Sequence, residues 1–173
     1  MKFLPIFLSL IVYSSHLFSQ TKEGIYQDEI DSQVWMPFIK AYNHNDYTEF
    51  HKLHSDNIRR VGRWGILMGE EYKQRNIKSF KRNDSLNIHR EIEIWFDMRA
   101  AKGNYAYEVG YYKITTSKPG SNENEFYYGF FHVVLEKNKG VWKIVQDWDD
   151  SKIGDRQLSN RDFMKATGRV YSE

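Results

Sequence analysis

The feature that most limits the fold of this chain is the period-two alternation of apolar residues through its second half. Four segments follow this pattern, and short turns rich in Gly, Asn, Lys or Pro separate them. Turns of this length join antiparallel neighbours, so the pattern predicts an antiparallel meander. The predicted strands are Ile88–Met98, Tyr105–Thr116, Glu125–Lys137 and Val141–Asp149.

Helical spacing dominates the part of the chain before these strands. Pro37 interrupts the first helical pattern, so either that helix kinks there or it begins near Trp35. Asp46 is placed to cap a second helix, with Glu49 three residues later. Helices followed by an antiparallel sheet indicate the α+β class. The predicted elements are helices at 28–43, from 47 onward and at 69–83, and short strands at 57–61 and 66–68.

Length and composition limit the classes of function that are open to the chain. The chain has 173 residues, which fits one domain, and 40% of them are hydrophobic, which is enough for one core. A net charge of +2 argues against nucleic-acid binding. The chain has no Cys, so disulfides, Cys-ligated zinc, iron–sulfur clusters and thiol catalysis are excluded.

The first 19 residues have the pattern of a secretory signal peptide. Lys2 is followed by the apolar run 3–13, and small Ser19 precedes Gln20. We therefore expect an exported protein, periplasmic or extracellular, that begins near Gln20 and has no membrane association once residues 1–19 are removed. A domain over 20–150 and a polar tail over 151–173 are expected to follow.

The strand at 126–135 is apolar on both of its faces. Helices can cover one face, and the other needs either the C-terminal tail or a second subunit. We predict a homodimer through the outer face of the sheet, with Trp142, Ile144 and Trp148 in the interface.

Several short motifs occur in a characteristic order. They are Trp35-x-x-Phe38-x-x-Ala41 with Asp46, Gly69 before the third helix, Ala106 to Tyr112, and Gly140 to Ile144 with Asp147. In this order they resemble the nuclear transport factor 2-like superfamily, specifically its SnoaL-like cone-shaped domains, over about Ile30 to Ser151. The resemblance implies that three N-terminal helices pack on a strongly curved antiparallel sheet, the cystatin-like cone, around an apolar cavity.

The resemblance extends to ketosteroid isomerases, whose chemistry needs a carboxylate base, a Tyr and a protonated acid. The matching positions hold Gly62 or Arg63, Phe38 and His132. The positions of the base and of the Tyr therefore lack the required side chain, and a His stands at the position of the acid. We therefore reject ketosteroid isomerisation.

The implied register turns His132 and Asp147 into the cone, where they could form a general acid/base pair; a structural His without a catalytic role is the alternative. Alternation alone cannot choose the inward face, because a slip of one residue inverts it. The predicted ligand pocket consists of Trp35, Phe38, Tyr42, Trp64, Tyr107, Val109, Tyr111, Tyr128, Phe130, Val145 and Asp149.

Other clusters are interpreted as structural, and neither a cofactor nor a metal is predicted. His51 and His54 share one helix face without a third ligand, which fits a solvated surface. The acidic end of the last strand fits solvation or pairing, and the basic cluster around Arg75 and Lys78 fits the exposed side of the third helix. The sequence favours a non-catalytic domain that binds a small, mostly apolar ligand. A proton-transfer enzyme, namely a lyase, isomerase or cyclase that uses His132 and Asp147, is the alternative, and an assembly module is a third possibility.

Overall fold

A computed structural model describes residues 22–164 and 170–173, so the predicted signal peptide lies outside the described residues. The first helical stretch runs without a break through α1 (Lys22–Ile30), the π-helix η1 (Asp31–Trp35) and α2 (Met36–Asn43). Pro37 has no N–H to donate, and it stands just after the wide π turn, in the first turn of α2. The helix therefore passes through Pro37 with a local change of pitch.

The next elements follow the local sequence signals closely. The Asp46 side chain accepts hydrogen bonds from the backbone N–H groups of Thr48 and Glu49, both at 3.0 Å, and so caps α3 (Tyr47–Lys52) as predicted. The hairpin of β1 (His54–Gly62) and β2 (Gly65–Met68) then leads into α4 (Gly69–Ser85).

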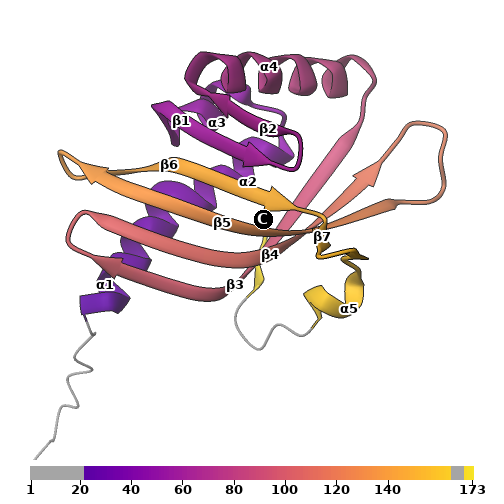
Figure 1. Cartoon of the computed structure of the whole chain (residues 1–173). Helices are drawn as coiled ribbons and strands as arrows, with labels where there is room; N and C mark the ends of the chain where they lie inside the picture. The colour runs from indigo at the N-terminus through magenta and orange to yellow at the C-terminus, as the bar shows by residue number, and fades with distance from the viewer. Residues whose placement is uncertain (1–21, 165–169) are drawn as a thin grey trace, which may run out of the picture.

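The sheet is open and mostly antiparallel, with the order β2-β1-β6-β5-β4-β3-β9. Its long strands are β3 (His89–Lys102), β4 (Tyr105–Ser117), β5 (Glu125–Asn138) and β6 (Val141–Asp150). They form the predicted meander, but β1 joins β6 in parallel. Figure 1 shows the sheet curving across the molecule, with α2 crossing behind it and α4 along one edge. The α+β cone is confirmed.

The inner face of the sheet packs on the helices through one core. Phe131, Val133 and Leu135 of β5 lie in it together with Trp35 and Ile39. Two glycines leave room for an aromatic ring of the neighbouring strand. Gly110 is opposite Phe131, and Gly129 is opposite Tyr112. An added Cβ at either glycine would overlap the facing ring.

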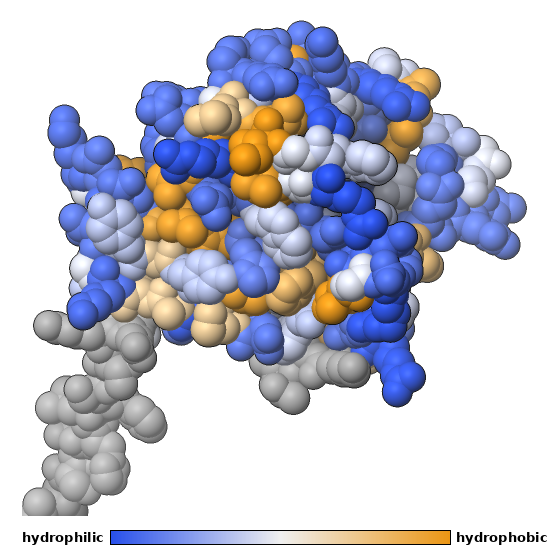
Figure 2. Space-filling view, viewed as in Figure 1, coloured by the Kyte–Doolittle hydropathy of each residue, from blue (hydrophilic) through white to orange (hydrophobic). Residues whose placement is uncertain are grey.

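The C-terminal segment covers part of the outer face. It contains β7 (Lys152–Ile153), β8 (Arg156–Gln157) and α5 (Asn160–Phe163), and β9 (Val170–Tyr171) then pairs with β3. Leu158 and Phe163 are buried, and the Phe163 ring packs near Tyr128. In Figure 2, which looks onto this face, apolar residues are scattered over the strands and hydrophilic residues surround them.

The predicted register is wrong on β4 and β5. Because Phe131 and Val133 point to the helices, the residues between them and their cross-strand partners point outward. Since β5 is apolar on both faces, the alternation of residues along it did not indicate which face is inward. The residues predicted inward that lie on the outer face are Tyr107, Val109, Tyr111, Tyr128, Phe130 and His132.

The strand β6 changes face in the middle. A β-bulge at Val145 adds one residue, so Ile144 and Asp147 both face inward. Trp142 and Ile144 are each 1% exposed in the core and are therefore not outer-face contacts. Trp148 does lie on the outer face, where its ring contacts those of Phe130 and His132.

Candidate functional site

A cavity of about 220 Å³ lies between the helices and the inner face of the sheet. Its wall is mainly aromatic and aliphatic, and it comes from η1, α2, α3, α4, β1 and the four long strands. Such a wall excludes water and favours apolar ligand groups. The aromatic lining residues are Trp35, Phe38, Tyr42, Phe50, Tyr72, Phe80, Tyr112 and Phe131.

Trp35 is held in this wall by a buried polar network. Its indole N–H donates to the carboxylate of Glu108, which is 1% exposed. Arg99 donates from Nε to the same carboxylate at 2.8 Å and from Nη2 to Asp31 at 2.6 Å. Tyr171 of β9 also donates to Asp31, at 2.8 Å. The network fixes the helix against β3, β4 and β9, and so fixes the position of the Trp35 ring.

One end of the cavity carries a charged cluster. Arg60 of β1 lies 3.1 Å from a carboxylate oxygen of Asp147 and 2.5 Å from one of Asp149. The Tyr112 hydroxyl donates to Asp149 at 2.8 Å. Since all four side chains line the cavity, a ligand there would meet two carboxylates, one guanidinium and one hydroxyl.

Asp147 differs from an ordinary surface carboxyl. Its side chain is 17% exposed, and it lines the cavity, so water reaches it poorly. Burial raises the pKa of Asp147 to about 6; the charge of Arg60 opposes this rise and the charge of Asp149 adds to it. Asp147 can therefore exchange a proton near neutral pH. Burial and the charge of Asp147 also raise the pKa of Tyr72.

Arg90 of β3 also lines the cavity. It donates to the Tyr42 hydroxyl at 3.1 Å and to the Asn45 side-chain oxygen at 3.0 Å. Its guanidinium also lies over the rings of Tyr42 and Phe80. The Tyr42 hydroxyl and the Asn45 oxygen are uncharged acceptors, so Arg90 makes both hydrogen bonds without a carboxylate partner.

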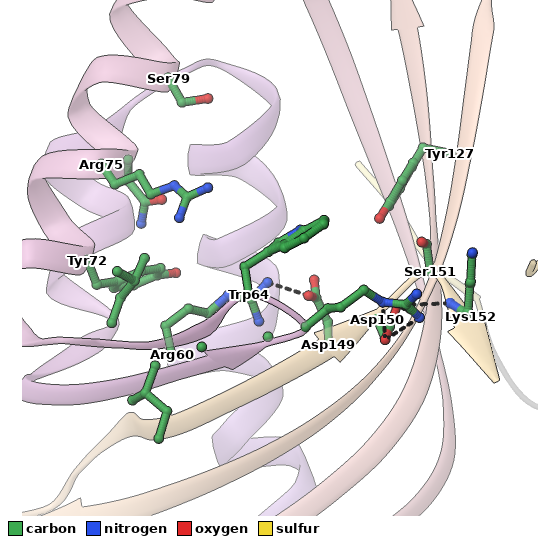
Figure 3. Close-up of a pocket in the computed structure, with 16 residues that line it drawn as sticks. Arg60, Trp64, Tyr72, Arg75, Ser79, Tyr127, Asp149, Asp150, Ser151 and Lys152 are labelled. Carbon is green, nitrogen blue, oxygen red and sulfur yellow. Dashed lines mark hydrogen bonds and ion pairs between the residues drawn. The ribbon is translucent and has the colours of Figure 1, made fainter. Parts of the chain in front are cut away.

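A wider hollow of about 620 Å³, which we call the mouth, adjoins the cavity at its charged cluster (Figure 3). The mouth shares Arg60, Tyr72 and Asp149 with the cavity. The β1–β2 turn contributes Trp64, which is 92% exposed. Figure 3 shows this indole projecting into the mouth.

Comparison with solved structures identifies the architecture. A conserved protein from Planctomyces limnophilus aligns with a TM-score of 0.62 at 15% identity, over 72% of this chain and 94% of its own. A proposed dehydratase of the NTF2-like family from Streptomyces avermitilis aligns with a TM-score of 0.60 at 12% identity, over 73% and 96%. The chain has the nuclear transport factor 2-like fold.

A third NTF2-like neighbour is a proposed scytalone dehydratase from Novosphingobium aromaticivorans, with a TM-score of 0.59 at 13% identity, over 78% of this chain and 90% of its own. No protein-family model and no curated protein matches the sequence. At these identities the likeness establishes the NTF2-like fold, and the chemistry has to be argued from the site itself.

The NTF2-like cone brings part of the predicted site together. Trp35, Phe38, Tyr42 and Asp149 line the cavity, as Asp147 does, and Trp64 lies at the mouth. Val145 lies at the bulge and lines a separate hollow. The predicted residues on the outer face of β4 and β5 do not reach the cavity.

The proposed pair of His132 and Asp147 does not form. Asp147 is opposite Val133, while His132 is opposite Trp148 on the other face. His132 instead contacts the Tyr107 hydroxyl through Nδ1, and burial lowers the pKa of His132. A one-residue difference in register therefore separates the predicted acid from the predicted base by the thickness of the sheet.

Several cavity residues were missed. Arg60 and Tyr112 are the main ones, together with Tyr72 and Arg90. Arg60 had a usable signal, because it stands two residues after Ile58 and so shares the inward face of β1 with a fully buried residue. Tyr112 had none, since both faces of its strand carry tyrosines.

The predicted solvated face with His51 and His54 is wrong for His54. That side chain is fully buried at the start of β1, and Nδ1 lies 2.8 Å from the Phe50 carbonyl oxygen. Burial lowers the pKa of His54 to about 3, so the ring is neutral. Within the described part of the chain, no group of three or more His, Asp or Glu residues is placed to hold a metal ion.

Proposed function

We propose that the protein binds a small, mostly apolar ligand in the cone, with one polar group of the ligand at the Arg60 cluster. The observation that carries this proposal is the aromatic cavity of about 220 Å³, in whose wall Arg60, Asp147, Asp149 and the Tyr112 hydroxyl form one charged cluster. This cluster orients a bound molecule, because a polar group of the ligand finds several strong hydrogen-bond partners there.

Blocking the entrance tests this proposal. Ser79 of α4 is exposed and lines both the mouth and the cavity, so Ser79→Trp is expected to obstruct entry at little cost in folding. We expect binding of the neutral fluorophore N-phenylnaphthylamine to fall about tenfold or more, the loss that follows from about 1.4 kcal/mol of binding free energy.

Lys78→Trp is the matched control, because Lys78 is the exposed neighbour of Ser79 and lines neither the mouth nor the cavity. Thermal unfolding of both variants checks that they are folded. Equal binding by the wild type and Ser79→Trp, or no binding by the wild type, would contradict ligand binding in the cone.

Proton transfer is a second candidate, and one observation favours it. Asp147 has a pKa of about 6, lines the cavity and is bound by Arg60, and a carboxyl with such a pKa can act as a base or an acid near neutral pH. Two of the similar structures are proposed dehydratases, which is consistent with this chemistry. An unfolding free energy that does not change between pH 4 and 6 would remove this candidate.

We also propose that the protein is exported and forms a homodimer through the outer face of the sheet. The pattern of residues 1–19 supports export. The outer face supports pairing, because Met98 and Tyr107 are 45% and 37% exposed on the same face as Trp148 and Phe130. No helix in the described ranges is long and apolar enough to cross a membrane.

Native mass spectrometry of the protein expressed with its first 19 residues measures both properties. We expect a dimer of chains that begin near Gln20, and we expect Trp148→Glu to give monomers because a carboxylate would be buried in an apolar contact. Trp64→Glu, which alters the exposed Trp at the mouth, is the control that keeps the dimer. A full-length mass would contradict export, and a monomeric wild type would contradict pairing.

A further inference from the structure

The charges around the mouth are unequal in number. Four cations and two carboxylates line it, and both carboxylates are already engaged. Asp150 accepts from Arg63 through Nε at 3.1 Å and Nη2 at 2.9 Å, and also from the backbone N–H of Lys152. Asp149 is held by Arg60 and Tyr112. The two carboxylates therefore balance only part of the positive charge that lines the mouth.

Arg75 and Lys152 carry this remaining charge. Among the described residues, no carboxylate lies within ion-pair distance of either side chain. They come from different elements, since Arg75 is on α4 and Lys152 is the first residue of β7. Figure 3 shows the Arg75 guanidinium directed into the mouth beside Ser79.

The apolar cavity and the positive mouth adjoin, because they share Arg60, Tyr72, Asn76, Ser79 and Asp149. An apolar group that fills the inner cavity would place whatever is attached to it in the mouth. A negatively charged group there would meet Arg75 and Lys152, while a positive group would meet them without compensation. The exposed indole of Trp64 offers a flat apolar surface at the same place.

We infer that the ligand is an amphiphilic organic anion, whose apolar body occupies the inner cavity and whose carboxylate, sulfonate or phosphate lies in the mouth, where Arg75 and Lys152 supply positive charge from opposite sides. This inference rests on the proposed function and adds the chemical class of the ligand. The inner wall selects the apolar body, and the mouth selects the negative charge.

Two fluorophores with the same ring system test the charge. Anilinonaphthalene sulfonate carries a sulfonate that N-phenylnaphthylamine lacks, so the ratio of their affinities isolates the anionic group. We expect the sulfonate to bind about tenfold more tightly at low salt, because Arg75 and Lys152 make the mouth attractive to an anion. The preference should shrink in about 0.5 M salt, because exposed charges are screened.

The variant Arg75→Gln with Lys152→Gln should abolish this preference and leave the affinity for N-phenylnaphthylamine within about twofold. Lys78→Gln with Arg82→Gln makes the same change of charge at exposed positions of α4 outside the mouth, and it should keep the preference. Circular dichroism confirms that both variants are folded.

The outcomes separate the two ideas. If neither fluorophore binds, or if Ser79→Trp leaves both affinities unchanged, the proposed function fails. If both fluorophores bind in the cone with equal affinity, or if the Arg75 and Lys152 variant keeps the preference, the anionic class is wrong while ligand binding stands.

Discussion

Replacing Arg60 with Met is expected to destabilise the protein strongly at pH 8 and only slightly at pH 5. Arg60 is the cation bound to both Asp147 and Asp149. Without it, two poorly hydrated carboxylates face each other, and we expect a loss of about 2–3 kcal/mol in the free energy of unfolding at pH 8, less than for a fully buried pair because each side chain keeps some exposure.

The direction of the pH dependence follows from the protons bound. The pKa of Asp147 is about 6 in the folded chain, against 3.8 for the unperturbed group. Between these values the folded state binds more protons than the unfolded state, so the contribution of Asp147 to stability declines as the pH rises through 4 to 6. Loss of Arg60 raises the pKa of Asp147 further, which extends this decline to higher pH.

Urea unfolding at pH 5 and pH 8 measures the effect. Arg59→Met is the control, since Arg59 is the exposed neighbour on the same strand and makes no ion pair within the described part of the chain. Adding Asp147→Asn to Arg60→Met should recover part of the loss at pH 8. An equal loss at both pH values would mean that Arg60 acts by packing rather than by charge.

Gly110→Ala is expected to be the most damaging small substitution in the sheet. A Cβ at this position would overlap the backbone carbonyl oxygen of Trp95 and would lie 2.7 and 2.8 Å from two atoms of the Phe131 ring. The carbonyl belongs to the paired strand β3 and cannot move alone. We expect a loss of about 3 kcal/mol in the free energy of unfolding, at the upper end of the usual cost of overpacking.

Chemical denaturation of Gly110→Ala beside Gly62→Ala checks this prediction. Gly62 is the matched control, because a Cβ there would meet no atom within 4 Å. Phe131→Leu in the Gly110→Ala background should relieve the contact with the ring but not the contact with the carbonyl. Similar stability of the two Ala variants would show that the strands separate more easily than the packing indicates.

The sequence alone was sufficient for the local elements. Asp46 and Glu49 marked the start of α3, and the period-two segments marked β3 to β6 within a few residues. These signals are local, since a cap, a turn or an alternation is written in neighbouring residues. The parallel pairing of β1 with β6 had no such signal, because it joins residues about ninety positions apart in the chain.

The sequence predicted cavity residues correctly only on an element with one apolar side, because only that side can face the core. Trp35, Phe38 and Tyr42 lie on the apolar side of one helix and do line the cavity. His132 lies on a strand that is apolar on both faces, and the inward face of the strand that carries Tyr107 includes the charged Glu108, so the alternation did not identify the inward face of either strand. The cluster of Arg60 with two aspartates needs β1 and β6 side by side, so no spacing along the chain could indicate it.

The sequence by itself determined the α+β class, the order of helices and strands, and the presence of enough aromatic residues for a lined cavity. The tertiary structure decided which face of each strand is inward, and it did so through the bulge at Val145 and through the C-terminal segment that covers the other face. The physical reason is that burial depends on what packs against a strand, and that partner is set by contacts between distant parts of the chain.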